Sequence, residues 1–540
     1  MQRPSGAVFL AFLVLILAVQ AALMFGKGIL LIDQHEGDAL HVLQIALRMG
    51  AGEWPHLDFT TPIGILAFAP ISALISMGVG AGKAVMGGGV LVALLMLPAI
   101  WWVCQTRLNG MWGWLLGGFL ILLVTALVYG GPVQVASISM YYNRWAWAVA
   151  FLLVLVTVLP GSRTTEPGDG LMLGFGLAFL VLSKVTFFVA LLPAILVALI
   201  LRQSRVTLGF GVLAGAVVAL LMTLIGGVDF WAAYLGDLRL VSASGIRPAP
   251  SDGLAVLLIG PSFLAGNLCL LAGVILLRQA GHATEGLLLL LLAPAFVYIT
   301  WQNWGNDPKW LILLAIVLMM LRPERHVNNA FGWDVGRAMG ITALVSLALI
   351  APTVVNLTFA NLRHAQMARS GFFQVLPGDR NGDIAMQISR MYAPARREGF
   401  DLSDAKIAAL VDQAVGDDAD MLFGQPLGAC KLAMGLVGVL HQMARDLEKV
   451  EGIAGATVFT ADTFSNLWLF GSTRPLPGGA PWYYGGDAGL GHADFVLIPL
   501  CPVTPRARTL VLDEIAAQSD PGLTEVMRND LFILLRRGNP

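Results

Sequence analysis

The chain has 540 residues, of which 57% are hydrophobic and only 12% are charged, and its formal net charge is −1. A soluble domain carries about 25% charged residues, so this composition excludes a protein whose whole surface faces water. The near-neutral charge gives no indication of nucleic-acid binding, and the four cysteines lack the C-x-x-C spacing of zinc sites.

Long apolar stretches fill the first two thirds of the chain. A spanning helix needs about 20 mostly apolar residues, and by this measure the sequence predicts eleven spans: 7–26, 84–104, 111–130, 145–160, 170–187, 188–201, 207–226, 254–277, 286–301, 310–321 and 334–355. The first span is interpreted as a retained anchor, because no cleavage site follows it closely. Charge becomes frequent towards the C-terminus, which predicts a transmembrane domain over 1–355 and a soluble domain over 356–540.

Basic residues indicate the orientation of these spans. If Arg3 lies inside, every even-numbered connection also falls inside, and each carries arginine: Arg107, Arg163, Arg202 with Arg205, Arg278, and Arg322 with Arg325. Cytoplasmic loops carry such an excess, so the 356–540 domain is expected outside. Counting the apolar segment 62–78 as a span would reverse the pattern, and we therefore expect it to be a short interfacial helix. The sequence predicts a multi-pass protein of a bacterial inner membrane with a cytoplasmic N-terminus and a periplasmic C-terminal domain.

The first outer loop, residues 27–83, concentrates acidic residues beside the membrane. From Asp38 onward, apolar residues recur at helical spacing, at Ala39, Val42, Leu43, Ala46 and Leu47. Asp38 is therefore expected at a helix N-terminus, where backbone N–H groups and the helix dipole favour an ionised carboxylate. Such a group suits a general base or a metal ligand, although an aspartate in this position is more often only a helix cap.

The stretch from Asp38 to Gly64 resembles the first extracytoplasmic loop of the GT-C superfamily. These membrane glycosyltransferases use polyprenyl-phosphate sugars and include protein mannosyltransferase-like and aminoarabinose transferase-like enzymes. Their loop runs D-E-x-x-Y, a helix, G-x-x-P-Y-x-D-F, and P-x-G before an interfacial helix. The matching positions here are Asp38, Gly52, Pro55, Asp58, Phe59, Pro62 and Gly64. The glutamate that usually follows the leading aspartate is Ala39 here, and Glu36 lies just upstream, which leaves open whether Glu36 or Asp38 is the base.

The resemblance implies a GT-C-like fold and an inverting transfer of sugar from a polyprenyl-phosphate donor to a glycan, lipid or protein acceptor at the outer face. It implies catalytic roles for Asp38, Glu36 and Asp58. A phosphate leaving group needs cationic help, and the cations expected near the outer face include Lys184, Lys309 and Arg144. Lys184 is the most informative because a charge near the end of a span is costly and often functional; snorkelling to the interface is the alternative.

Polar residues between two spans, in W-Q-N-W-G-N-D-P-K-W (301–310), are further candidates. Asn303, Asn306 and Asp307 are expected to bind sugar or phosphate, and His56 of the first outer loop is grouped with them. Tryptophans also form ordinary interface belts, so those of this loop indicate little by themselves. The sequence predicts no particular cofactor and leaves dependence on a divalent metal open.

The soluble domain is expected to have an α/β layer structure. Helices are predicted over 404–415 and 429–449, and strands over 455–462, 493–500 and 530–537. Cys430 and Cys501 both fall in this domain, and an oxidising compartment favours a disulfide between them; two buried free thiols are the alternative.

Two other functions remain open at this stage. A transporter or flippase of lipid-linked glycans would show polar residues within its spans and often repeated halves. The chain has few charged residues in mid-span and no clear repeat, which disfavours this alternative. A non-catalytic scaffold with an outer binding domain is the third possibility.

Overall fold

The computed structural model describes residues 5–246, 253–302, 307–392, 395–396, 420–428, 430, 432–518 and 522–538. The chain forms two compact units. Unit 1 comprises Met1–Leu30, Ile63–Val228 and Ala249–Met367, and unit 2 comprises Leu31–Pro62, Asp229–Pro248 and Ala368–Pro540.

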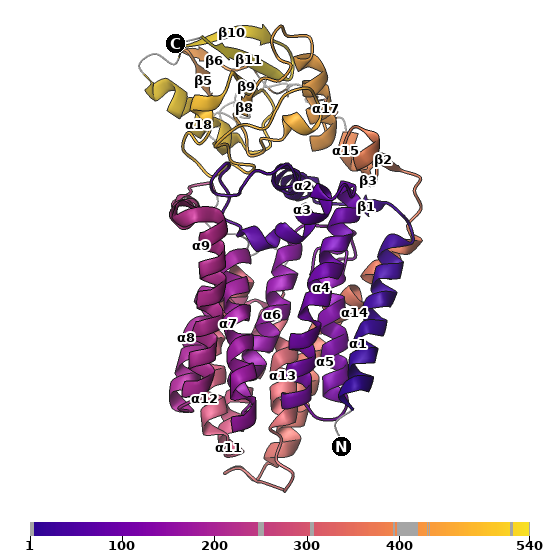
Figure 1. Ribbon diagram of the computed structural model, residues 1–540, viewed down its shortest axis with the longest axis vertical. Helices are drawn as coiled ribbons and strands as arrows, with labels where there is room; N and C mark the ends of the chain where they lie inside the picture. The colour runs from indigo at the N-terminus through magenta and orange to yellow at the C-terminus, as the bar shows by residue number, and fades with distance from the viewer. Residues whose placement is uncertain are drawn as a thin grey trace, which may run out of the picture. The chain divides into compact units, whose positions relative to one another are not determined.

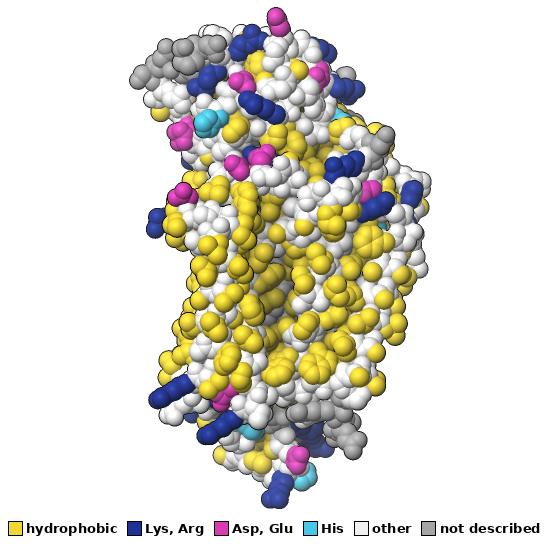
Figure 2. Space-filling model, viewed as in Figure 1, with side chains coloured by type: hydrophobic (Ala, Val, Ile, Leu, Met, Phe, Trp, Pro, Cys, Tyr) yellow, Lys and Arg dark blue, Asp and Glu magenta, His cyan; other side chains and the backbone are white. Residues whose placement is uncertain are grey.

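Unit 1 is built from apolar helices (Figure 1). They are α1 (Gly6–Phe25), α3 (Ala69–Ser76), α4 (Ala81–Arg107), α5 (Met111–Thr125), α6 (Tyr141–Val158), α7 (Glu166–Ser183), α8 (Val185–Leu201), the first part of α9 (Arg205–Ser242), α10 (Leu254–Ile259), α11 (Pro261–Gln279), α12 (Ala283–Trp301), α13 (Trp310–Met320) and α14 (Val335–Gln366). Hydrophobic side chains cover much of the helical face seen in Figure 2. Among the described residues, seven helices are long and apolar enough to cross a membrane, and four more apolar helices are shorter. The chain is therefore a polytopic helical membrane protein.

Each of the eleven predicted spans overlaps an apolar helix, but two of them contain a helix break. The predicted span 170–187 runs past Ser183, where α7 ends, into α8, which starts at Val185. The predicted span 254–277 is two helices, because α10 ends at Ile259 and α11 starts at Pro261. Proline has no N–H to donate and disfavours helical geometry in the residue before it, so the helix breaks at Gly260. Whether all eleven helices cross the membrane remains a prediction.

The segment 62–78 forms only a 3₁₀ turn, η1 (Ile65–Ala67), and the eight-residue helix α3. Eight residues at 1.5 Å each extend about 12 Å, far less than the hydrocarbon thickness of a bilayer. The prediction that this segment does not span is therefore confirmed.

Helix α9 is divided at Gly227, which has a non-helical backbone (φ 77°, ψ 174°). Glycine tolerates this left-handed value because it has no Cβ. The predicted span 207–226 ends just before the break, and the part of α9 from Asp229 onward belongs to unit 2.

Unit 2 contains the helix α2 (Glu36–Gly50) of the first outer loop and the mixed α/β segment near the C-terminus. Its main sheet has the order β10 (Leu523–Arg528), β11 (Phe532–Arg537), β9 (Phe495–Pro499) and β8 (Val458–Thr460). Strands β10, β11 and β9 pair antiparallel, whereas β8 and β9 pair parallel. The three predicted strands are confirmed as β8, β9 and β11, and they are neighbours in this sheet.

Unit 2 also contains several smaller elements. The helices are α15 (Ile388–Tyr392), α17 (Leu436–Leu447) and α18 (Pro505–Ala517). A second sheet has the order β1 (Leu30–Ile32), β3 (Ile384–Gln387) and β2 (Phe372–Gln374). Two further pairs of strands join β4 (Ala395–Arg396) to β7 (Leu432–Ala433) and β5 (Met421–Leu422) to β6 (Gln425–Pro426). The predicted helix 429–449 is shorter than expected, because the chain enters α17 only after Gly435. The predicted helix 404–415 lies outside the described residues.

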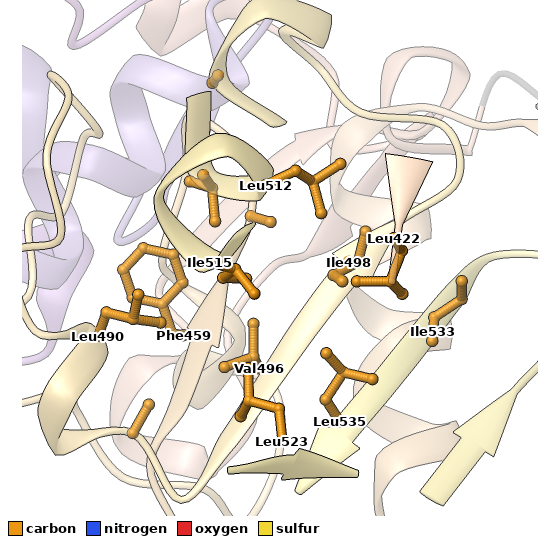
Figure 3. Close-up of a cluster of buried hydrophobic side chains, with 14 of the residues drawn as sticks. Leu422, Phe459, Leu490, Val496, Ile498, Leu512, Ile515, Leu523, Ile533 and Leu535 are labelled. Atoms are coloured by element: carbon orange, nitrogen blue, oxygen red, sulfur yellow. The ribbon is translucent and has the colours of Figure 1, made fainter. Parts of the chain in front are cut away.

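The core of unit 2 lies between one face of the main sheet and α18 (Figure 3). Val496 and Ile498 of β9 point to the same face because side chains alternate along a strand. Ile533 and Leu535 of β11 join them, and α18 contributes Ile515 and its neighbours. Each such side chain stabilises the fold by about 1.5–3 kcal/mol when it is removed from water.

Cys430 and Cys501 form a disulfide, with 4.8 Å between their Cα atoms. The predicted bond is therefore confirmed. It joins the segment after β6 to the segment that follows β9, across 71 residues of sequence.

Removal of this bond is expected to destabilise unit 2. A Cys430→Ser/Cys501→Ser variant should lose about 2–5 kcal/mol of unfolding free energy, because its unfolded chain regains the entropy that the cross-link removes. Thermal unfolding of the purified protein, with and without reductant, measures this loss. Cys269→Ala is the control, since Cys269 is a free cysteine and its variant should keep the full response to reductant. Alkylation of both Cys430 and Cys501 without prior reduction would contradict the assignment.

Candidate active site

The first turn of α2 is acidic and begins earlier than the sequence predicts. The helix starts at Glu36, after His35 in a left-handed conformation (φ 68°), and Asp38 is its third residue. Asp38 therefore lies in the first turn at the helix N-terminus, as expected, but the N-cap residue is His35. A Cβ on Gly37 would lie 2.5 Å from a ring carbon of Phe464, so the Phe464 ring packs directly against this turn.

Glu36 is buried and is held by Arg390 of α15. The Arg390 Nε donates to Glu36 Oε1, and Arg390 Nη2 donates to Oε2 at 3.3 Å. The hydrogen bond with Glu36 raises the pKa of Arg390 above its usual value. Such a two-pronged pair neutralises the carboxylate of Glu36 and occupies both of its oxygens. Asp38, two residues further on, is partly exposed.

His35 completes this cluster, and sequence reasoning missed it. Burial lowers the pKa of His35, against the opposing effect of the Asp38 and Glu36 carboxylates and with a smaller contribution from Arg390. A histidine with a pKa below 6.5 is mostly neutral at pH 7 and can accept a proton. The only sequence signal for it is its position next to two acidic residues.

Arg48, near the other end of α2, organises the rest of the loop. Its side chain is only 3% exposed, and its Nε donates to Glu53 Oε2 at 2.7 Å. Its Nη2 donates to the carbonyls of Asp58 (3.3 Å) and Leu476 (3.2 Å), and its guanidinium lies 4.5 Å from the ring centroid of Phe59. Burial lowers the pKa of Arg48, with Glu53 opposing this effect. The G-x-x-P-x-x-D-F segment is therefore folded around one arginine.

Asp58 closes a turn within that segment. Its side chain is exposed, and its Oδ2 accepts from the backbone N–H of Trp54 at 2.6 Å. Its own N–H donates to the Trp54 carbonyl at 2.9 Å, and its carbonyl accepts from Gly478 N–H at 2.8 Å. These contacts give Asp58 a role in shaping the loop.

His56 is buried and paired with an aspartate of α9. His56 Nδ1 lies 2.8 Å from Asp237 Oδ2, which also accepts from the backbone N–H of Thr61 at 3.0 Å. The ring of His56 packs 4.5 Å from the ring centroid of Tyr234. Asp237 therefore fixes both His56 and the chain just before the P-x-G motif, within unit 2.

In unit 1, the motif glycine Gly64 lies against the junction of α7 and α8. Its N–H donates to the Ser183 carbonyl at 3.2 Å, and a Cβ on Gly64 would lie 2.2 Å from the Leu182 carbonyl oxygen. The next residue is Lys184, whose Nζ lies 5.5 Å from the ring centroid of Tyr142. The chain that leaves the first outer loop thus passes directly over the segment that carries Lys184.

Lys184 and Lys309 occupy equivalent positions in their helices. Lys184 is the N-cap of α8 and Lys309 is the N-cap of α13. A helix N-terminus carries a partial positive charge and unsatisfied N–H groups, and it binds anions readily. Lys309 is 1% exposed and forms an ion pair with Asp307. Asn303 and Asn306 lie outside the described residues.

Arg144 has a different environment from the two lysines. It is 3% exposed, and its guanidinium donates to backbone carbonyls after α5, including those of Val128 and Ala126, the latter at 2.8 Å. It therefore holds the 126–139 connection in place. Among the described residues, no group of three or more His, Cys, Asp or Glu side chains could hold a metal ion.

No protein-family model matches the chain, and no curated protein matches it. Two solved structures are similar to it: ArnT from Cupriavidus metallidurans in the apo state, at 12% identity and a TM-score of 0.43, and the same protein bound to undecaprenyl phosphate, at 10% identity and a TM-score of 0.41. Each comparison covers 98% of this chain and 98% of the other. Similarity at this level assigns neither a fold nor an activity to the chain.

The contact of Gly64 with the α7–α8 junction can be tested by adding a methyl group. Gly64→Ala is expected to destabilise the protein by about 1–3 kcal/mol, because backbone atoms cannot move aside as a side chain can. Gly215→Ala in α9 is the matched control, since a Cβ there meets nothing within 4 Å and alanine favours a helix by up to about 1 kcal/mol. Thermal unfolding in detergent measures both, and equal melting temperatures for the two variants would contradict the contact.

Proposed function

We propose that this chain is a GT-C-type glycosyltransferase. It transfers a sugar from a polyprenyl-phosphate donor to a glycan, lipid or protein acceptor at the outer face of a bacterial inner membrane. Both its first outer loop and its C-terminal domain face the periplasm in this proposal, as the basic connections predict.

The observation that carries the proposal is the state of the two acids in the first turn of α2. Arg390 binds both oxygens of Glu36, whereas Asp38 is partly exposed at the positive end of the helix. A general base must be ionised and must reach its substrate. These contacts favour Asp38 over Glu36 as the base, a choice that the sequence leaves open.

The chemical step follows from these roles. Asp38 accepts the proton of an acceptor hydroxyl, and the hydroxyl oxygen attacks the anomeric carbon of the donor sugar. The bond between that carbon and the phosphate oxygen breaks, with inversion, and the polyprenyl phosphate leaves with the bonding electrons. Lys184 and Lys309, each at a helix N-terminus, stabilise the negative charge that develops on the phosphate.

Asp58 and His56 have supporting roles in this proposal. Asp58 closes the Trp54–Asp58 turn, and His56 is held by Asp237. Both shape the loop that follows α2, and substrate contacts are assigned to Asp38, Lys184, Lys309 and the segment around Asp307.

Replacement of Asp38 tests the catalytic assignment. Asp38→Asn is expected to slow sugar transfer by about 10²–10⁴-fold, because it removes the base while keeping the shape of the side chain. The measurement is transfer from a polyprenyl-phosphate sugar by purified, folded protein. Asp513→Asn, on the exposed face of α18, is the control and should keep full activity. Near-normal turnover in Asp38→Asn together with an inactive Glu36→Gln would show that the base is Glu36, and full activity in both would refute the mechanism.

Replacement of the lysines tests the leaving-group assignment. Lys184→Gln is expected to lower kcat by about 10²–10³-fold, as for loss of one group that stabilises a developing anion. Lys309 is tested in the double variant Lys309→Gln/Asp307→Asn. The single change Lys309→Gln would leave the Asp307 carboxylate without its ion-pair partner, which is destabilising by itself. Lys449→Gln, at an exposed position of unit 2, is the control. If the Lys184 variant and the double variant both transfer sugar at the control's rate, the phosphate site lies elsewhere.

A further inference from the structure

A polar cavity of about 450 Å³ lies in unit 1. Its walls come from the end of α4, the α6–α7 connection, the α8–α9 connection and the start of α12. These are the connections whose arginines predict a cytoplasmic location. Figure 2 shows Lys, Arg, Asp and Glu side chains gathered near the end of the helices at the bottom of the view.

Two ion pairs form the frame of this cavity. Arg107 pairs with Asp169 and donates from Nε to the Leu159 carbonyl at 3.2 Å. Arg202 pairs with Glu285 at 3.3 Å and donates to the Thr157 carbonyl at 2.7 Å. These contacts connect α4 to α7 and α8 to α12, so the cavity has fixed walls.

Within the described part of the chain, one polar group at the cavity is buried without a hydrogen-bond partner, and two more charged side chains there have no protein partner, Arg163 being exposed and Glu166 partly exposed. Arg107 Nη1 is buried and has no hydrogen-bond partner there. Arg163 and Glu166 both line the cavity, and no hydrogen bond or ion pair of either side chain occurs among the described residues. A buried donor without an acceptor costs about 1–3 kcal/mol, so a ligand that supplies an acceptor is favoured.

The charges at the cavity balance. Three arginines, Arg107, Arg163 and Arg202, face three acids, Glu166, Asp169 and Glu285. A cavity with no net charge does not concentrate simple anions. A ligand with a negative and a positive group can instead satisfy the unpaired donors and the unpaired carboxylate together.

We propose that this cavity binds a zwitterionic phosphoethanolamine group, supplied by the headgroup of a membrane phospholipid. The phosphate accepts from Arg107 Nη1 and Arg163, and the ammonium donates to Glu166. Leu173, Ile195 and Leu199 provide apolar walls beside these groups. Basic pockets between spans on the cytoplasmic side bind the phosphates of anionic lipid headgroups, and the additional carboxylate of Glu166 in this cavity favours a headgroup that also carries an ammonium. This site is independent of the proposed glycosyltransferase activity.

Ligand-dependent unfolding of the purified full-length protein tests the proposal. The probes are a short-chain phosphatidylethanolamine, a matched phosphatidylglycerol, free phosphoethanolamine and inorganic phosphate. We expect phosphatidylethanolamine to raise the melting temperature saturably, free phosphoethanolamine to act in the same direction at higher concentration, and the other two to act weakly.

Variants locate the effect. Glu166→Gln should abolish the preference for phosphatidylethanolamine over phosphatidylglycerol, because only the ammonium needs the carboxylate. Arg163→Gln should weaken binding of both lipids about tenfold. Glu324→Gln and Arg325→Gln, on the α13–α14 connection outside the cavity, are matched controls and should behave as the unmodified protein.

The outcomes separate the sources of the ligand. If free phosphoethanolamine raises the melting temperature as much as the lipid does, and both cavity variants abolish this effect, the result supports binding of a phosphoethanolamine group but refutes the membrane phospholipid as its source. Equal shifts from both lipids in the unmodified protein, an equal shift from inorganic phosphate, or unchanged binding in Glu166→Gln and Arg163→Gln would overturn the proposal.

Discussion

A single buried guanidinium, that of Arg48, determines how the first outer loop folds. It binds Glu53 and the carbonyls of Asp58 and Leu476, and it lies over Phe59. An arginine removed from water costs several kcal/mol unless its N–H groups are satisfied. The turn around Asp58 and the loop around Leu476 must therefore form together with α2. Helix α2 is 15 residues long, so its acidic first turn lies about 22 Å from its other end. Because Arg48 anchors that other end, it also determines where the acidic first turn lies.

Patterns that are local in sequence predicted much of the fold. Apolar runs gave the positions of the spanning helices, and short alternating or apolar runs gave β8, β9 and β11. The start of α2 was predicted two residues too late, since the helix already begins at Glu36, whose carboxylate is held by Arg390 from another part of the chain. The break between α10 and α11 was overlooked, although Pro261 is a local signal for it.

For the candidate site, the residues that the sequence could predict differ more clearly from those that only the structure shows. Asp38 and Lys184 were proposed from sequence, one by a motif and the other by an unusual charge at the end of a span. Arg390 and Asp237 were not, because their partners Glu36 and His56 lie 354 and 181 residues away. Arg144 illustrates the opposite problem. A charge in an apolar run indicates function, but only the structure shows that carbonyls after α5 need its N–H groups.

The composition of unit 2 from three separate stretches of chain, Leu31–Pro62, Asp229–Pro248 and Ala368–Pro540, also constrains how the protein is made. The first stretch leaves the ribosome hundreds of residues before the last one. Until the C-terminal stretch has been synthesised, Arg48 has no Leu476 carbonyl and Glu36 has no Arg390. In the predicted orientation, the early loop therefore waits outside the membrane, incompletely folded and exposed to proteases and chaperones, while all the remaining spans are inserted. Translation of the final third of the chain is what completes the fold of the loop encoded near its beginning.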